Sequence, residues 1–289
     1  MKLIETTVKL LPFISGEDGI YKMIERAGRT CYKSTDKMTD DSAKPFVERM
    51  IKSGHTAMLE HGTVYLLFDC IRKEYLDYHG QEYEQNPYSK VKFWCSDVDP
   101  DERKYFITTN LRVIYENNWL DDLKYLCDPT EFHEMRYTFR MLTSIGVTRE
   151  LNRHRVNSIA EQSTRYCNYS KDKFGNEITF CNPVWAPDYD EADWDRFLKA
   201  LFEAENAYLG LINQGWQPQQ AREVLPLCTA SEIIHTAFAS DWRFFFDLRL
   251  FGKTGNPHPN MLLLAQKMKA EAEDKGVWND IMKYPSKFK

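Results

Sequence analysis

Residues 149–166 read RELNRHRVNSIAEQSTRY and hold four arginines and no lysine between Arg149 and Arg165. The chain as a whole has a formal net charge of −5 at pH 7, so this positive cluster is local. An arginine side chain presents a planar fork that binds a phosphate at two points, whereas lysine acts as a point charge. The segment therefore indicates a site for a phosphorylated ligand. A solvated helix face is the alternative, and composition alone does not decide between them.

Spacing within this segment indicates which side chains act together. Arg149 and Arg153 lie one helical turn apart, so a helix would place them on one face. Ser163 and Arg165 lie two positions apart, which in extended or turn geometry places a hydroxyl and a guanidinium on the same side. No base is identifiable beside Ser163 in the sequence, so a phosphate-binding hydroxyl is favoured over a nucleophile.

The flanking sequence predicts a mixed α+β domain with a central antiparallel sheet flanked by long helices. Strands are expected at residues 63–70, a β-branched and aromatic run, and at 136–143, which leads into a helix from about residue 146. Other helices are expected from apolar residues at helical spacing, near residues 20–27, 46–51, 109–117, 119–127, 193–214, 219–225, 240–251 and 258–275. Phe245 and Phe246 are assigned to the core.

The composition changes between about residues 71 and 133, where Tyr, Asp, Glu, Lys and Asn are frequent and aromatic residues are interleaved. We interpret this stretch as an insertion in a single domain of residues 1–289. The sequence does not indicate what the insertion does.

The remaining composition limits the class of protein. The seven cysteines are scattered without any Cys-x-x-Cys spacing, which is typical of a reducing cytoplasm. The N-terminal residues do not resemble a signal peptide, and no apolar run approaches the roughly 18 residues of a membrane span. The acidic balance argues against a nucleic-acid partner. His61, His235 and His258 lack metal-ligand spacing, so no metal site is expected.

Arg153-His154-Arg155, seven further residues and then Ser163 resemble the signature of the flavin-dependent thymidylate synthases. Two other segments resemble the same family in the same order. Residues 54–61, GHTAMLEH, resemble its segment with a flavin-contacting histidine, and residues 221–226, AREVLP, with 241–249, DWRFFFDLR, resemble its C-terminal half. The resemblance covers essentially the whole chain except the expected insertion.

The resemblance implies that dUMP, FAD and a folate meet in a pocket built by several subunits of a homotetramer. It implies methylenetetrahydrofolate as the carbon donor and NADPH as the source of reducing equivalents. The residues implied for dUMP are Glu150, Arg153, Glu161, Gln162, Ser163, Arg165, Arg222 and Arg249. Those implied for the flavin are His55, Arg153, His154, Arg155 and Glu161. Arg249 is the implied catalytic residue, because a fixed cation beside the uracil N3 and O2 stabilises negative charge on the ring.

The sequence departs from the family pattern mainly around the flavin. Ala57, Ala160, Phe238 and Phe244 occupy positions that are often polar in relatives, and each change removes a hydrogen-bonding group. Such a loss is worth on the order of 1 kcal/mol for a single contact. Three readings follow: a synthase that makes dTMP, a variant that forms 5-hydroxymethyl-dUMP, and a non-catalytic nucleotide-binding homologue without flavin.

Overall fold

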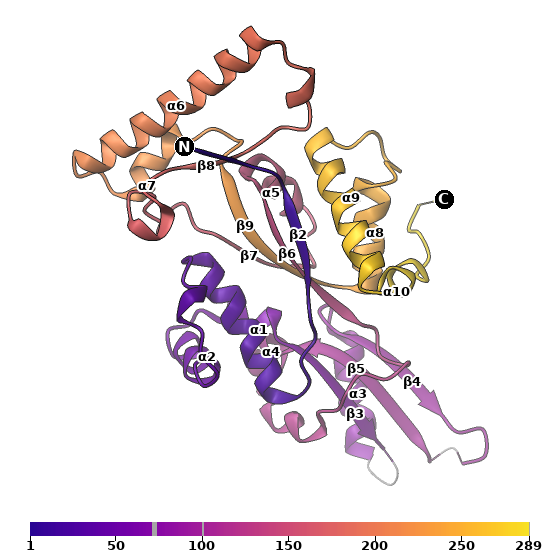
Figure 1. Cartoon of the computed structure of the whole chain (residues 1–289). Coiled ribbons are helices and arrows are strands. Elements are labelled where there is room, and N and C mark those ends of the chain that lie inside the picture. The colour runs from indigo at the N-terminus through magenta and orange to yellow at the C-terminus, as the bar shows by residue number, and fades with distance from the viewer. Residues whose placement is uncertain (71–73, 100, 289) are drawn as a thin grey trace.

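A four-stranded antiparallel sheet lies at the centre of the computed structural model, which describes residues 1–70, 74–99 and 101–288 (Figure 1). Its strand order is β2 (Thr7–Leu11), β6 (Arg136–Ser144), β9 (Ala230–Phe238) and β7 (Ser158–Glu161). Each neighbouring pair is antiparallel. Every residue of β9 is buried, because both of its faces are covered and both of its edges are paired. The expected central antiparallel sheet is confirmed.

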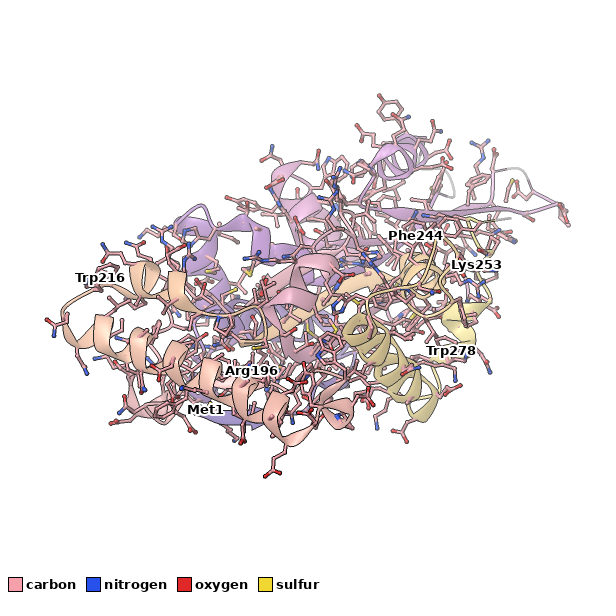
Figure 2. All side chains as sticks on the ribbon, turned by 90° about the horizontal axis from the view of Figure 1, so that it is seen from above. Met1, Arg196, Trp216, Phe244, Lys253 and Trp278 are labelled. Atoms are coloured by element: carbon pink, nitrogen blue, oxygen red, sulfur yellow. The ribbon has the colours of Figure 1, made fainter. Side chains whose placement is uncertain are left out.

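The longest helix, α6 (Glu191–Asn213), lies at the periphery of the molecule (Figures 1 and 2). Asp190 caps it by accepting a hydrogen bond from the backbone N–H of Asp193 at 2.8 Å. Arg196 on this helix and Trp216 just beyond it have exposed side chains (Figure 2). The expected helix at 193–214 is therefore confirmed, and it begins two residues earlier because of this cap.

A small apolar cluster attaches α6 to the rest of the chain, with Phe180, Leu201 and Tyr208 at its centre. Neighbouring elements are the parallel pair β1 (Lys2–Ile4) and β8 (Thr179–Cys181), and the short helix α7 (Pro218–Ala221). The 3-10 helices of the described residues are η1 (Thr35–Lys37), η2 (Thr56–His61), η3 (Leu120–Tyr125), η4 (Asp172–Phe174), η5 (Ala186–Asp188) and η6 (Arg222–Val224).

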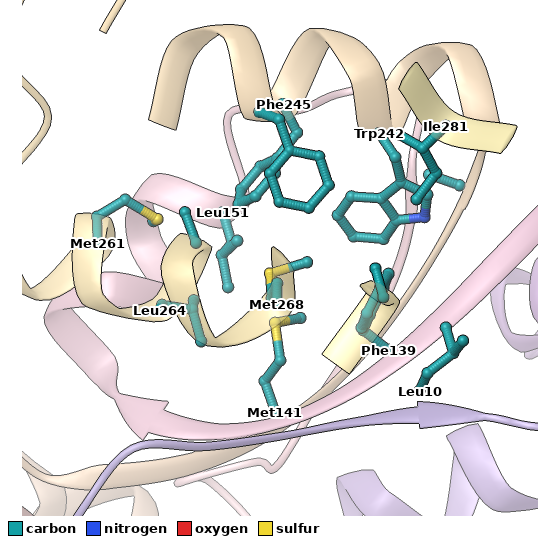
Figure 3. Packing of buried hydrophobic residues seen from close by; sticks show 14 of the residues in the cluster. Leu10, Phe139, Met141, Leu151, Trp242, Phe245, Met261, Leu264, Met268 and Ile281 are labelled. Carbon is teal, nitrogen blue, oxygen red and sulfur yellow. The ribbon is translucent and has the colours of Figure 1, made fainter. Parts of the chain in front are cut away.

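The main core lies between the central sheet and four helices (Figure 3). These helices are α5 (Ile145–Leu151), α8 (Ala239–Arg249), α9 (Pro259–Asp274) and α10 (Trp278–Met282). Trp242 is fully buried, and its ring centroid lies 5.0 Å from that of Phe139. Its indole N–H donates to the Tyr137 carbonyl at 3.0 Å. Phe245 and Phe246 are fully buried, as the sequence predicted.

The opposite face of the sheet is covered by α1 (Gly16–Cys31), and α2 (Ala43–Lys52) packs on α1 (Figure 1). Gly28 permits this close packing, because a Cβ there would lie 2.8 Å from the ring of Phe46. Both helices were expected from sequence, and Ser42 is the N-cap residue of α2.

A second antiparallel sheet follows, with strand order β3 (Thr63–Asp69), β5 (Arg103–Asn110) and β4 (Lys90–Cys95). Helices α3 (Glu74–Gln85) and α4 (Leu111–Glu116) accompany it. Gly80 allows α3 to approach the sheet, because a Cβ there would lie 2.6 Å from the Tyr105 ring. Of the stretch expected to be an insertion, residues 71–73 and 100 lie outside the described residues. None of the described helices has the length and apolar composition that crossing a membrane requires.

Four local predictions were wrong in detail. The single helix expected at 219–225 is the short helix α7 followed by the 3-10 helix η6. The helix expected at 119–127 is the 3-10 helix η3. The helix expected at 109–117 begins only at Leu111, because β5 continues to Asn110, whose side chain caps α4 by accepting from the Val113 N–H at 3.1 Å. Arg149 and Arg153 do not share a helix face, because α5 ends at Leu151.

His235 gives the fold a predictable sensitivity to acid. Both of its ring nitrogens are buried without a hydrogen-bond partner among the described residues, and its ring packs on Trp242 at 4.6 Å between centroids. Burial lowers the pKa of His235 well below its usual value, so the unfolded state binds the proton first as pH falls. Stability is therefore lost below about pH 6.5, by about 1.4 kcal/mol per pH unit for one such histidine.

The variant His235→Phe is expected to reduce the slope of this dependence, because it replaces a buried titratable ring by an apolar one of similar size. His61 and His154, whose pKa values burial also lowers, keep their share of the slope. Urea unfolding of both proteins between pH 7 and pH 5 measures the slope. An unchanged slope in the variant would show that His235 does not carry the effect.

Candidate functional site

The arginine-rich segment runs from α5 through a turn into β7 and then into the loop after β7. Ser144 caps α5 by accepting from the Val147 N–H at 3.4 Å, so the helix starts where the sequence predicted. The chain tightens after Leu151, where the His154 N–H donates to the Leu151 carbonyl at 3.0 Å. This turn buries the His154 side chain and leaves Arg153 and Arg155 exposed.

Arg249, at the last turn of α8, meets Glu150 and His154. Its Nη1 donates to Glu150 Oε2 at 2.8 Å, its Nη2 to the Glu150 carbonyl at 3.4 Å, and its Nε to His154 Nε2 at 3.4 Å. Burial, reinforced by the charge of Arg249, lowers the pKa of His154 to about 4. The imidazole is therefore neutral near pH 7 and its Nε2 can accept from the guanidinium. The ring also packs on Phe245, with centroids 5.2 Å apart. The cluster holds a cation in a fixed orientation.

Glu161, on β7, is held by two hydroxyl groups. Thr148 Oγ1 donates to its Oε1 at 2.7 Å and Ser231 Oγ at 2.9 Å. The next residue, Gln162, is buried and donates from its side chain to the Tyr169 hydroxyl at 3.4 Å. Sequence reasoning identified Glu161 but not its two supports, because Ser231 reaches it only through the pairing of β7 with β9.

Ser163, Arg165 and Arg222 meet at the loop after β7. The backbone N–H of Arg165 donates to Ser163 Oγ at 3.2 Å, which is the turn geometry expected from their spacing. Arg165 Nε donates to Gln219 Oε1 at 3.1 Å, and Arg222 Nη1 donates to Thr164 Oγ1 at 3.3 Å. These two hydrogen bonds connect the loop after β7 to α7 and η6 and bring two guanidinium groups far apart in sequence to the same region, a donor set that suits an anion.

The structure does not join His55, Arg153 or Arg155 to either cluster. These side chains are exposed, and none makes a side-chain hydrogen bond or ion pair with another described residue. His55 precedes the 3-10 helix η2, and its backbone N–H donates to the Met50 carbonyl at 2.9 Å. Within one chain, some of the sequence-predicted residues have fixed hydrogen-bond partners, whereas His55, Arg153 and Arg155 are directed to solvent.

Two features near these residues were missed by sequence reasoning. Buried Glu232 accepts from Arg140 Nε at 2.7 Å and from Lys33 Nζ at 3.0 Å. Burial alone would raise the pKa of Glu232, but the hydrogen bond from Arg140 and the charge of Lys33 hold it below its usual value. A pattern of isolated charges gives no local signal for such a triad, since its members come from three separate segments.

The other missed feature is a pocket of about 410 Å³ beside Glu150. Aromatic side chains of Trp185, Tyr189 and Phe197 line it together with His258. Among the residues that the structure describes, no group of three or more His, Cys, Asp or Glu side chains is arranged to hold a metal ion.

Comparison with known proteins identifies similar sequences. A family model described as thymidylate synthase complementing protein matches residues 96–275. The flavin-dependent thymidylate synthase of Pyrococcus furiosus is 32% identical over 103 residues, which are 36% of this chain and 41% of that protein. The flavin-dependent thymidylate synthase of Geobacter sulfurreducens is 30% identical over 135 residues, which are 45% of this chain and 55% of that protein. The matches therefore span only about half of the length of these relatives.

Among solved structures, a UMP/dUMP methylase, PolB from Streptomyces cacaoi, aligns over 98% of both chains. In its structure bound with 5-Br dUMP, the sequence identity is 17% and the TM-score is 0.46. In its structure bound with 5-Br UMP, the identity is 18% and the TM-score is 0.47.

Proposed function

The chain belongs to the thymidylate synthase complementing protein family, and from this premise we propose that it converts dUMP to dTMP. In this proposal methylenetetrahydrofolate supplies the carbon, and FAD with NADPH supplies the reducing equivalents. The observation that supports the proposal is the Glu150–His154–Arg249 cluster, which holds in a fixed orientation the guanidinium of the residue that the family resemblance implies as catalytic.

Arg249 has the properties that activation of a uracil ring requires. It makes three N–H contacts with described residues, and a guanidinium has five N–H groups, so two are left for a ligand among the contacts that the structure describes. Its side chain is 20% exposed, so solvent screening of its charge is reduced. A cation held in this way beside N3 and O2 stabilises negative charge on the ring and raises electron density at carbon 5. Glu150 and His154 act by positioning it.

We propose that Ser163, Arg165 and Arg222 bind the phosphate of dUMP. Arg165 and Arg222 supply charge-assisted donors, and the Ser163 hydroxyl supplies a neutral one. The hydrogen bonds to Gln219 and Thr164 orient the two guanidinium groups before the ligand arrives. Such preorganisation reduces the entropic cost of binding.

The residues present fit the phosphate part of FAD better than its ring. Arg153 and Arg155 are exposed cations without side-chain partners among the described residues, which suits a diphosphate. Phe238 is buried under Arg136, whose guanidinium carbon lies 5.2 Å from the ring centroid, and Phe244 stacks on Phe288 at 5.5 Å. Both positions thus carry packed aromatic rings that cannot hydrogen-bond to a flavin. When bound and reduced, FAD supplies a hydride.

We propose that the assembly is a homotetramer in which neighbouring subunits complete each site. The exposure of Arg153, Arg155 and His55 supports this, because these side chains are directed to solvent in a single chain. Exposed side chains of this kind can contact a ligand that binds at an interface between two subunits.

Arg165→Ala is expected to weaken dUMP binding about ten- to hundredfold, because one charge-assisted contact to phosphate is worth about 1.5–3 kcal/mol. Calorimetric titration with dUMP measures the change. Arg196→Ala is the matched control, because Arg196 is an exposed arginine whose partner is Asp193 on the same helix. Equal dUMP affinity in the Arg165 variant and in the control would contradict the phosphate role.

A second candidate product is 5-hydroxymethyl-dUMP, which arises when water rather than hydride completes the reaction. Phe238 and Phe244 favour it, because a flavin held by fewer hydrogen bonds delivers hydride less effectively. Mass analysis of the nucleotide formed from dUMP, methylenetetrahydrofolate, FAD and NADPH separates the two. The proposal expects the gain of one methyl group, and unchanged dUMP under these conditions would contradict it.

A further inference from the structure

A pocket of about 570 Å³ lies between β2, α1, β6 and the segment that joins α9 to α10. It is lined by Lys9, Leu10, Leu11, Pro12, Phe13, Ile14, Gly19, Ile20, Met23, His61, Thr63, Met135, Arg136, Tyr137, Thr138, Lys275 and Val277. None of the residues proposed for dUMP or the flavin is among them. Its size is within the range of pockets that bind small molecules.

Most of the lining is apolar, and three of the apolar residues, Pro12, Phe13 and Ile14, are exposed. Phe13 is 44% exposed and Ile14 is 46% exposed, and these residues connect β2 to α1. Met23 lies on α1, and Met135 immediately precedes β6. Methionine side chains adapt to irregular shapes, so these walls suit a flexible apolar ligand.

Arg136 lines this pocket and is a buried cation, 6% exposed. Its Nη1 donates to the Glu60 carbonyl and to Thr63 Oγ1, each at 3.1 Å, and its Nη2 donates to Ser158 Oγ at 3.1 Å. No carboxylate of the described residues lies within ion-pair distance, and its Nε has no acceptor. A buried charge without a counter-ion is costly, since the desolvation penalty of an ion is several kcal/mol.

His61 lines the same pocket and is 1% exposed. Its Nδ1 lies 2.9 Å from Thr236 Oγ1, and its Nε2 is buried without a partner. Burial, reinforced by the charge of Arg136, lowers the pKa of His61 to about 3, so the ring is neutral near pH 7. In the tautomer in which Thr236 donates to Nδ1, Nε2 carries a proton that it can donate to an anion.

The charges of the lining residues are all of one sign. Lys9 adds to Arg136, whereas the charge of Lys275 is paired with Asp274 at 2.7 Å. No acidic residue lines the pocket, although the chain has a net charge of −5. A low-dielectric concavity lined by one sign of charge concentrates ions of the opposite sign. The complementary ligand is therefore an anion.

We propose that this pocket binds a small amphiphilic carboxylate, with its apolar chain along β2 and α1 and its head group beside Arg136 and His61. The carboxylate supplies the counter-ion that Arg136 lacks and an acceptor for each of the two unpartnered nitrogens. This site is separate from the nucleotide site, so it extends the proposed function and does not depend on it.

The test is calorimetric titration of the full chain, once alone and once in the presence of FAD and dUMP, with octanoate and with octanol as the uncharged probe of equal chain length. Octanoate is expected to bind saturably and at least about tenfold more tightly than octanol, because it alone makes charge-assisted hydrogen bonds. Absence of octanoate binding, or equal affinity for both probes, would overturn the proposal. Since both outcomes are read without turnover, they are independent of whether the chain makes dTMP.

Substitutions at two positions locate the binding. Ile14→Glu places a negative charge at an exposed position of the lining, and Ile14→Gln is its uncharged counterpart of equal size. The glutamate variant is expected to lose most of the octanoate affinity while the glutamine variant retains it. Arg136→Met is expected to remove the preference for octanoate over octanol. Equal octanoate affinity in the two Ile14 variants would place the anion elsewhere and refute the assignment.

Discussion

Replacing Arg249 by alanine is expected to lower turnover about a hundred- to a thousandfold while leaving the fold intact, a barrier increase of about 2.7–4 kcal/mol. The loss is large because the substitution removes the one cation that the Glu150–His154 pair holds in place. The fold survives because the partner carboxylate of Glu150 is 30% exposed and can be solvated by water. Steady-state kinetics with dUMP measure the loss of turnover, and thermal unfolding measures whether the fold is retained.

Arg249→Lys separates charge from geometry in the same experiment. A lysine keeps the positive charge but cannot donate to Glu150 and His154 in the planar arrangement, so an intermediate rate is expected. Arg196→Ala on α6 is the control, because that arginine is 80% exposed. Turnover of Arg249→Ala close to that of the unmodified protein, with an unchanged unfolding temperature, would refute the role of Arg249.

Replacing Trp242 by alanine is expected to cost about 3–5 kcal/mol of unfolding free energy, the largest effect on stability that we predict. The indole is fully buried between β6 and α8, where its ring centroid lies 5.0 Å from Phe139 and 5.4 Å from Phe245 (Figure 3). Its removal leaves a cavity and also leaves the Tyr137 carbonyl without its donor. Equilibrium urea unfolding measures the loss.

Trp216→Ala is the matched control, because this tryptophan is 47% exposed just beyond the end of α6 (Figure 2). Its loss is expected to change stability by less than about 0.5 kcal/mol. If the two alanine variants unfold at the same urea concentration, the core between the central sheet and α8 does not carry the stability that we assign to it.

Much of the fold could be predicted from local sequence patterns. The run TVYLLFD forms β3, and the apolar face and acidic start of residues 191–213 form α6. Prediction failed where backbone capping overrode a repeating pattern. Arg149 and Arg153 have helical spacing, but the chain turns after Leu151 so that His154 packs on Phe245. The end of this helix therefore depends on a contact with Phe245, which is almost one hundred positions away in sequence.

The candidate site was predicted as a set of residues but not as an arrangement. The motif indicated Glu161, yet the hydroxyl groups of Thr148 and Ser231 that hold it follow from the pairing of β7 with β9. Arg136 was assigned only to a strand, because a single arginine in an alternating sequence gives no signal of burial. Its position as a buried cation in the lining of a pocket follows from its contacts with Glu60 and Ser158, which come from other segments of the chain.

The most direct test of the account is a spectroscopic titration of the FAD-loaded protein with dUMP. If fixed guanidinium groups hold the nucleotide against the flavin, the visible absorbance bands of the bound FAD shift saturably as dUMP is added. The Arg165→Ala variant then requires about ten- to hundredfold more dUMP for the same shift. A chain that takes up no FAD and shows no affinity for dUMP would contradict the account.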